Sequence, residues 1–482
     1  MGETLMNQLI FEKSGKGRHA FDFPRFEEKN EIPKAYLKDP SDHLGLPEIS
    51  ELDVIRHYVE AAQLNFHIEK GLYPLGSCTM KYNPRINEEM ASLSGFANLH
   101  PYAPEELTQG AMFLIDQLSQ WLCKLSGMDA VTLLPAAGAQ GEFTGLQLIR
   151  AYHLDHGFKK TKILIPDSAH GTNPASSALC GYDVIKVPSN ERGILDPETV
   201  EGLLDDGVAA LMLTNPNTLG LFEENILKIA NLLHNKNAFV YCDGANFNAL
   251  MGQVNLSAMG VDLLQFNLHK TFSTPHGGGG PGGGPVAVKK ELIPYLPIPR
   301  LIREGDHYHW KSDFPKTIGR IKGFFGNFGV FVRAYTYMRA MGIDGLTQAS
   351  QLAVLNANYI KARLRNAWHL PYDDRPCMHE VIFSDKIQQR FKVKTLDIAK
   401  RLMDYGFHPP TIYFPLIVSG ALMIEPPETE SKEEIDRFCD AMLAIAKECE
   451  TDPEKVLRAP STTPVGRVDE VKAARQLKLT SS

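Results

Sequence analysis

Short apolar segments alternate with amphipathic segments of helical period over residues 104–290, and this alternation restricts the possible folds more than any other feature of the chain. A chain that alternates in this way folds as an α/β structure around a mostly parallel sheet. Gly127 is expected to end the first helix, and Asp196 with Pro197 to begin a later one. The expected strands are 130–135, 161–167, 182–188, 209–215, 238–243, 261–268 and 285–290, and the expected helices are 104–127, 141–154, 197–204 and 224–236.

The pattern changes near residue 335. A long helical segment is expected at 334–364, then strands at 379–384, 411–416 and 421–426, and a helix at 433–450. A chain of 482 residues also exceeds what one hydrophobic core usually serves. The sequence therefore predicts an extended arm with a helix at 1–65, a large α/β domain at 66–335, and a smaller C-terminal α+β domain with a tail at 336–482.

Composition excludes several partners and locations. The formal net charge is −7 and no long basic run occurs, so neither nucleic acid nor an anionic membrane surface is an expected partner. Seven scattered cysteines without a C-x-x-C pair are typical of a reducing compartment. Glu3 and Glu12 do not fit a transit peptide, and Met6 does not fit the myristoylation pattern. A cytoplasmic protein is expected.

Three common sites are not predicted. The run 277–282 matches G-x-G-x-x-G, but an expected strand and not a helix follows it. The P-loop pattern fails because the glycines come after Lys270 and not before it. No metal site is expected, because no histidine or cysteine pair belongs to a set of four at zinc-like spacing. The nearest pairs are His307 and His309, Cys377 and His379, and His153 and His156.

Small or polar residues follow five of the expected strands, at 136–141, 168–172, 215–217, 243–245 and 269–271. In a parallel sheet, ligands bind beyond the carboxyl ends of the strands. These tails offer an amine (Lys270), an acid (Asp243), an aromatic ring (His170) and a small-residue helix start that can seat an anion. Pyridoxal phosphate (PLP) needs such a set. Taken singly, Lys270 reads as a surface charge, Asp243 as a turn or cap residue and His170 as a core histidine, so the combination favours PLP without deciding it.

Longer motifs identify a family. The segment NLHKTFSTPHGGGGPG, with LLPAAGAQGEFTGL, DSAHGTNPAS and YPLGSCTMKYNP, resembles the P-protein family of the glycine cleavage system, the PLP-dependent glycine decarboxylases. The segments GFHPPTIYFP, EPPETESKEEIDRFCDAM and STTPVGRVDEVKAAR are similar too, so the resemblance covers most of residues 70–475. A chain of this length that carries the lysine motif looks like subunit 2, the PLP-bearing subunit of the two-chain form.

The resemblance implies a fold, an activity and partners. The implied fold is PLP-dependent transferase fold type I (aspartate-aminotransferase-like). The implied activity is that of glycine dehydrogenase (aminomethyl-transferring, decarboxylating), an oxidoreductase that releases CO2 from glycine and passes the aminomethyl group to the lipoyl disulfide of the H-protein. A homologous subunit 1 in an α2β2 heterotetramer is the implied partner.

The resemblance also assigns site residues by position. Lys270 would bear PLP as a covalent Schiff base, His170 would stack on its ring and Asp243 would pair with the ring nitrogen. Asn215 is expected near the 3′ oxygen of the cofactor. The predicted phosphate seat consists of Ala137, Gly138, Ala139 and His269.

Several points stay open at this stage. The glycines at 277–284 are either a backbone surface for close approach or a loop without contacts, and residues 77–81 line either the site entrance or a buried turn. His276 either transfers a proton to the lipoyl sulfur or faces solvent, and no carboxylate-binding role is assigned to Lys81 or Arg85. The alternative functions are another fold-type-I enzyme, such as an amino-acid decarboxylase or a desulfurase that uses Cys78, and a catalytically silent assembly subunit.

Overall fold

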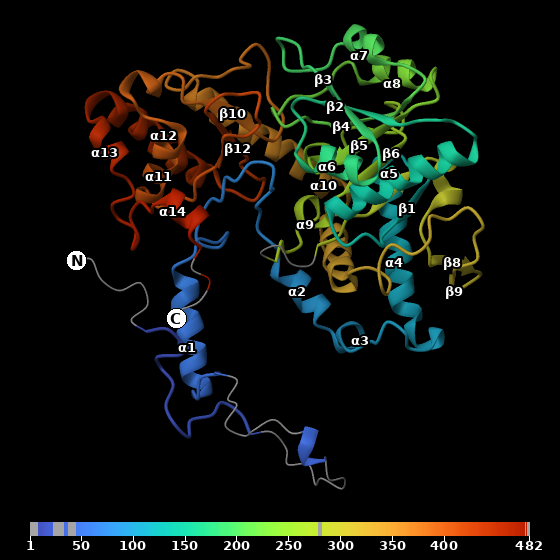
Figure 1. Ribbon diagram of the computed structural model, residues 1–482, viewed down its shortest axis with the longest axis horizontal. Coiled ribbons are helices and arrows are strands. Elements are labelled where there is room, and N and C mark those ends of the chain that lie inside the picture. The colour runs from blue at the N-terminus through green and yellow to red at the C-terminus, as the bar shows by residue number, and fades with distance from the viewer. Residues whose placement is uncertain (1–7, 23–32, 37–44, 278–281, 478, 480–482) are drawn as a thin grey trace. The chain divides into compact units, whose positions relative to one another are not determined.

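A computed structural model describes residues 8–22, 33–36, 45–277, 282–477 and 479 (Figure 1). The chain forms two compact units, one made of residues 1–70 with 459–482 and the other of residues 71–458. The residues discussed below as a site all belong to the second unit. The domain boundaries expected after residues 65 and 335 stay predictions.

The main sheet has seven strands in the described part of the chain, in the order β1-β7-β6-β5-β4-β2-β3. Only β7 runs antiparallel to its neighbours in this sheet as described, so the expected mostly parallel sheet is confirmed. The strands are β1 (Ala130–Thr132), β2 (Lys162–Pro166), β3 (Asp183–Val187), β4 (Val208–Thr214), β5 (Phe239–Gly244), β6 (Leu263–Phe266) and β7 (Val286–Val288).

Both faces of the inner strands of this sheet are covered, which explains the continuous apolar run of β4, whereas the edge strand β3 is largely exposed. Successive side chains of a strand point to opposite faces. Leu211 of β4 accordingly packs in a core with α4 (Glu105–Ser126), α8 (Ile226–His234) and α10 (Phe328–Leu364), whereas Met212 packs in a second core with α5 (Gly138–Asp155). The sheet edge between these layers is where the strand tails emerge.

Local signals in the sequence determine several helix ends. Gly127 ends α4 in the left-handed conformation (φ 77°, ψ 14°), where it avoids the Cβ strain of other residues. Asp196 and Pro197 begin α7 (Pro197–Leu203) as expected. The carboxylate of Asp196 accepts a hydrogen bond from Asn190 Nδ2 (2.7 Å) and makes no capping bond.

A second, antiparallel sheet of three described strands has the order β10-β12-β11 and its own hydrophobic core. This arrangement matches the α+β pattern expected for the C-terminal part. Its elements are β10 (Val381–Ser384), β11 (Thr411–Ile412), β12 (Ala421–Ile424), α11 (Thr395–Asp404), α12 (Lys432–Thr451) and α13 (Pro453–Leu457). The sequence did not predict α11 or the hairpin of β8 (Arg300–Glu304) and β9 (His307–Lys311).

The remaining elements are short or lie outside the sheets. They are α1 (Glu51–Gln63), α2 (Arg85–Ala91), α3 (Ser94–Ala97), α6 (Thr172–Leu179), α9 (Leu268–Thr271), α14 (Glu470–Arg475), η1 (Lys34–Tyr36), η2 (Phe247–Ala249), η3 (Lys290–Tyr295) and η4 (Gln388–Phe391). No helix in the described ranges is both long and apolar enough to span a membrane. All seven cysteines lie in the described ranges and are free thiols.

Candidate active site

A cavity of about 230 Å³ lies at the carboxyl ends of the main-sheet strands. The tails of β1, β2, β4, β5 and β6 contribute to its wall, together with Ser77 from the segment before α2. These segments meet because the strands that they follow all end at the same edge of the sheet. The lining residues are Ser77, Ala137, Gly138, Ala139, Glu142, His170, Thr172, Thr214, Thr218, Asp243, Ala245, Asn246, Asn267, His269 and Lys270.

Lys270 lies in the single-turn helix α9, directly after β6. Its side chain is half-buried, and Nζ donates a hydrogen bond to the backbone oxygen of Ser77 (2.6 Å). A carbonyl and not a carboxylate therefore holds this amine. Such a contact orients the nitrogen without tying it into an ion pair.

Asp243 is 3% exposed at the end of β5, and three donors orient its carboxylate. Asn173 Nδ2 donates to Oδ2 (2.9 Å), while the backbone N–H of Ala245 (3.0 Å) and Gln265 Nε2 donate to Oδ1. None of these partners is a cation, so the negative charge is oriented but not neutralised. A carboxylate held in this way can keep a proton on a nitrogen that faces it.

His170 belongs to a polar chain that continues into α5. Its Nδ1 lies 2.8 Å from Thr172 Oγ1, which donates to Glu142 Oε1 (2.8 Å). Desolvation and then the positive charge of Lys270 lower the pKa of His170, which favours a neutral ring. Burial and the nearby Asp243 raise the pKa of Glu142 to about 7.

Glu142 was missed at the level of the sequence. Its position in the sequence is a signal that could have revealed it. Glu142 lies one turn inside a helix whose first residues form the predicted anion seat. A carboxyl group at that position faces the same strand ends as Asp243.

The predicted phosphate seat is the start of α5. Ala137 is its N-cap, no side chain caps it, and Gly138 is its first residue. The first N–H groups of a helix lack partners within the helix, so they are available to an anion. His269 lines the same cavity, and its Nδ1 has no partner among the described residues. Burial lowers its pKa to about 3, with His276 and Lys270 adding to the shift.

Asn215 is placed differently from the other predicted residues. It is buried, and its Oδ1 accepts a hydrogen bond from the backbone N–H of Glu223 (3.1 Å). Thr214, and not Asn215, lines the cavity. Neighbouring residues of an extended segment point to opposite sides, so one position along the strand end changes which side chain reaches the site.

Three glycines of the run, Gly282, Gly283 and Gly284, pack closely against neighbouring residues. Residues 278–281 lie outside the described residues. An added Cβ at Gly282 would lie 2.5 Å from His269 Nδ1, and one at Gly283 would lie 2.7 Å from Leu268 Cδ1. At Gly284 it would overlap the backbone of Ala137. Close packing at these three positions therefore excludes larger side chains.

Lys81 and His276 have specific surroundings. Lys81 is 3% exposed and donates to Glu428 Oε1 (2.7 Å) and to the oxygen of Thr271 (2.8 Å). Burial opposes the charged form of Lys81, but the charge and hydrogen bond of Glu428, together with those of Tyr337, outweigh it and raise the pKa of Lys81 to about 12. The His276 ring is half-buried and lies edge-on to His269, with ring centres 5.3 Å apart. Lys81 is thus part of a buried ion pair and not a free cation for a substrate.

The cavity residues fit PLP. An amine, an oriented carboxylate, a neutral imidazole and an uncapped helix start face one space, and each corresponds to one part of the cofactor. Within the part of the chain that the structure describes, three buried polar atoms from the lining also have no protein partner: Thr214 Oγ1, Asn267 Oδ1 and His269 Nδ1. They leave hydrogen-bonding capacity for a polar ligand.

Fold and site together define the class of PLP-dependent enzymes of fold type I. Residues 144–295 match the aminotransferase class-V family, and residues 349–461 match the C-terminal domain of glycine dehydrogenase. Among solved structures, the inhibitor-bound glycine decarboxylase (P-protein) of the glycine cleavage system is similar, with a TM-score of 0.71, 19% identity and coverage of 86% of this chain and 93% of that one. The cysteine desulfurase from Thermococcus onnurineus NA1 is also similar, with a TM-score of 0.61, 18% identity and coverage of 79% and 95%. These two likenesses concern the fold.

Curated relatives identify the family within this class. A probable glycine dehydrogenase (decarboxylating) subunit 2 from Caldanaerobacter subterraneus subsp. tengcongensis is 54% identical over 475 residues, which cover 97% of each chain. The protein of the same name from Bacillus thuringiensis is 54% identical over 476 residues, covering 97% of this chain and 96% of the other. The chain belongs to the family of glycine dehydrogenase (decarboxylating) subunit 2. The resemblance seen in the sequence motifs is therefore confirmed.

Proposed function

We propose that this chain is the PLP-binding subunit of a glycine decarboxylase, which releases CO2 from glycine and transfers the aminomethyl group to the lipoyl disulfide of an H-protein. The observation that carries the proposal is the placement of Lys270, Asp243 and His170 around one cavity of about 230 Å³. Membership of the subunit 2 family supports the choice of glycine as the substrate.

Each residue has a separate task in this proposal. Lys270 would hold PLP through its amine, and the helix start at Gly138 would bind the phosphate. PLP, when bound, supplies an electron sink for the pair of electrons left by departing CO2. Asp243 would keep a proton on the ring nitrogen, because three neutral donors orient its carboxylate and none of them is a cation.

His170, which Thr172 links to Glu142, would contact the ring of the cofactor. A neutral His170 ring would pack against the cofactor without adding a positive charge that competes with Asp243 for the ring proton. Thr172 links this ring to Glu142 and so restricts its rotation. Ala137, Ala139 and His269 complete the proposed phosphate seat, whereas Asn215 is left out of the proposed contacts because it does not line the cavity.

The proposed assembly pairs this chain with a homologous subunit 1 in an α2β2 heterotetramer in the cytoplasm. Relatives with the designation subunit 2 support the existence of a partner subunit. The expected catalytic species is the complete assembly with H-protein present, and the chain alone is expected to be inactive.

A desulfurase is the second candidate, because cysteine desulfurases share the fold. Such chemistry requires a reactive thiol, and Cys78 directly follows Ser77, which lines the cavity. Burial raises the pKa of the Cys78 thiol, more than the positive charge of Lys270 lowers it. A reactive thiolate needs the opposite shift. This observation favours decarboxylation over desulfuration.

Borohydride reduction tests the proposal. PLP-saturated chain is reduced and digested, and the modified peptide is mapped by mass spectrometry; a pyridoxyl group is expected on Lys270 and on no residue of the Lys270→Ala variant. Lys289→Ala serves as a matched control and should keep the adduct. Glycine–CO2 exchange is then measured with partner subunit and H-protein. An unmodified Lys270 in folded, PLP-saturated protein would refute the site, and an adduct without exchange would refute the substrate.

A further inference from the structure

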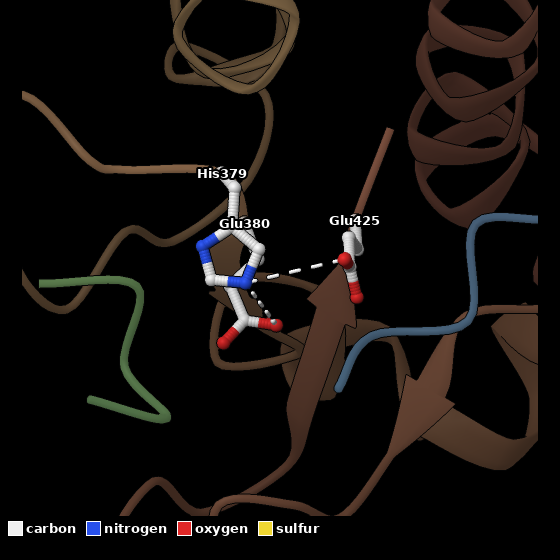
Figure 2. A group of neighbouring side chains, drawn as sticks. All are labelled: His379, Glu380 and Glu425. Carbon is white, nitrogen blue, oxygen red and sulfur yellow. Dashed lines mark ion pairs between the residues drawn. The ribbon is translucent and has the colours of Figure 1, made fainter. Parts of the chain in front are cut away.

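Three buried side chains form a group that the sequence did not reveal: His379, Glu380 and Glu425 (Figure 2). Their exposed fractions are 0%, 0% and 1%. Figure 2 shows His379 Nε2 pointing toward both carboxylates, 3.9 Å from Glu380 Oε2 and 4.0 Å from Glu425 Oε1. Neither ring nitrogen of His379 has a hydrogen-bond partner among the residues that the structure describes. The group thus combines two carboxyl groups and an unpartnered imidazole away from water.

Both carboxyl groups hold the segment Ser77–Thr79. Glu380 Oε2 accepts a hydrogen bond from the backbone N–H of Ser77 (3.1 Å). Glu425 accepts two from Thr79, the N–H to Oε2 (3.0 Å) and the hydroxyl to Oε1 (2.6 Å). These contacts join a segment before α2 to residues more than 300 positions away in the chain.

The segment needs such support because its backbone is strained. Ser77 has a φ of 64° and Thr79 a φ of 48°, in the left-handed region that non-glycine residues rarely adopt. Residues in such a conformation persist only where the surroundings over-determine them. The hydrogen bonds that Glu380 and Glu425 accept fix the backbone at both residues.

The Ser77 peptide connects the group to Lys270. Its N–H donates to Glu380 and its oxygen accepts from Lys270 Nζ (2.6 Å). Desolvation raises the pKa of both Glu380 and Glu425; the charge of Glu425 adds to the shift at Glu380 and that of Glu428 to the shift at Glu425, while the positive charge of Lys270 opposes both. Two buried carboxyl groups this close cannot both ionise without help, so Lys270 and the group are electrostatically linked.

We propose that Glu380 and Glu425 are positioning residues that hold Ser77–Thr79 in its strained conformation, so that the Ser77 carbonyl receives the Lys270 ammonium whenever this amine is not bonded to the cofactor. The inference rests on the proposed role of Lys270. A fixed acceptor holds the released amine beside the cavity, where it can bond to the cofactor again. His379 fills the space between the carboxyl groups as a neutral ring, because burial lowers its pKa to about 3.

A divalent cation is the other occupant that a histidine and two carboxylates can hold. Donors from Thr79, Ser77 and Asn248 already occupy three of the four carboxylate oxygens. The positive charge of Lys270 also acts on all three members of the group. The geometry therefore favours the positioning role.

Hydrogen–deuterium exchange of the full, cofactor-free chain tests the proposal at the amides of Ser77 and Thr79. Glu380→Leu and Glu425→Leu should speed exchange in the peptide that contains residues 77–79 at least tenfold. Glu380→Gln and Glu425→Gln keep an oxygen acceptor and should retain most of the protection. Glu223→Leu removes an equally buried carboxyl group, which is 2% exposed, and should leave this peptide unchanged.

A kinetic readout separates positioning from general stability. In the complete assembly, the Leu variants should lower kcat at least tenfold with KM for glycine changed less than threefold, and the Gln variants should recover most of kcat. Lys270→Met should leave exchange at residues 77–79 slow, because the carboxyl groups and not the lysine hold the segment. That result is independent of whether Lys270 bears the cofactor, which the borohydride adduct decides.

Three results would overturn the proposal. One is unchanged exchange at residues 77–79 in folded Leu variants. Another is fast exchange in Lys270→Met, which would make the lysine the support of the segment. The third is protection of the segment by added Zn²⁺ or Mn²⁺ that the Gln variants abolish, which would identify a cation site. Should the Leu variants fail to fold, Thr79→Val, which removes one donor to Glu425, must still speed exchange.

Discussion

Replacing Gly284 by alanine should destabilise the chain and weaken PLP binding, although the change adds one methyl group. An added Cβ would lie 2.0 Å from the Ala137 oxygen and 3.0 Å from the nitrogen of Gly138. Real Cβ atoms do not approach other atoms more closely than 3.0 Å, so the two backbone segments must separate by about 1 Å. No side chain can move aside to relieve this overlap.

The cost follows from the contacts that this separation breaks. Gly284 N–H donates to the Pro135 oxygen (3.0 Å), and a displacement of 1 Å breaks this bond. A lost buried hydrogen bond with its unpaired groups, together with overpacking, costs roughly 2–4 kcal/mol. With an unfolding entropy of roughly 0.8 kcal/mol/K for a unit of this length, Tm should fall by about 3–5 °C. The same displacement moves the Gly138 N–H groups, so Kd for PLP should rise at least tenfold, or about 1.4 kcal/mol.

Gly110→Ala is the matched control, because Gly110 lies exposed within α4 and an added Cβ there meets no atom within 4 Å. It should stabilise the chain by about 0.5–1 kcal/mol through helix propensity. Thermal unfolding of cofactor-free protein and titration with PLP by absorbance measure both effects. If Gly284→Ala melted within 1 °C of the wild type and bound PLP equally well, the steric reasoning would be refuted.

Three further predictions concern charged groups. Asp243→Asn keeps the shape of the side chain but removes the charge. The kcat for glycine–CO2 exchange should therefore fall about 100-fold or more, while Kd for PLP changes less than tenfold. Activity equal to that of the wild type would exclude the proposed role of Asp243. Lys81→Met leaves Glu428 buried without its cation and should cost about 3–5 kcal/mol in urea unfolding, part of which Lys81→Met/Glu428→Gln should restore. The pKa of Lys81, about 12, lies above the 10.5 of the unfolded chain, so its stabilisation should persist below pH 10.5 and be lost as the pH rises toward 12. The pKa of Glu142, about 7, lies above the unfolded value of 4.5, so stability should fall by roughly 3 kcal/mol as the pH rises between these values. Glu142→Gln should show a smaller change in Tm between pH 5 and pH 8, and an unchanged slope would contradict the raised pKa.

Local patterns in the sequence were sufficient for the elements of the main sheet. Short apolar runs that alternate with amphipathic helical segments are typical of buried strands, and Gly127 and Pro197 carry their backbone preferences wherever they occur. Because parallel strands all end at one edge, the placement of Lys270, Asp243 and His170 at strand ends predicted that they would meet. The cavity contains all three.

Tertiary structure alone decided which groups complete the site. Nothing near Ser77 in the chain indicates that its carbonyl meets Lys270, 193 residues away, or that Glu380 lies behind it. The side-chain direction at the end of β4 brought Thr214 and not Asn215 to the cavity. Burial and contact across the fold set the pKa of Glu142 and the strained backbone of Ser77, because both depend on neighbours that local sequence does not specify. The sequence alone determined where the reactive groups lie along the strands, and packing determined what surrounds them.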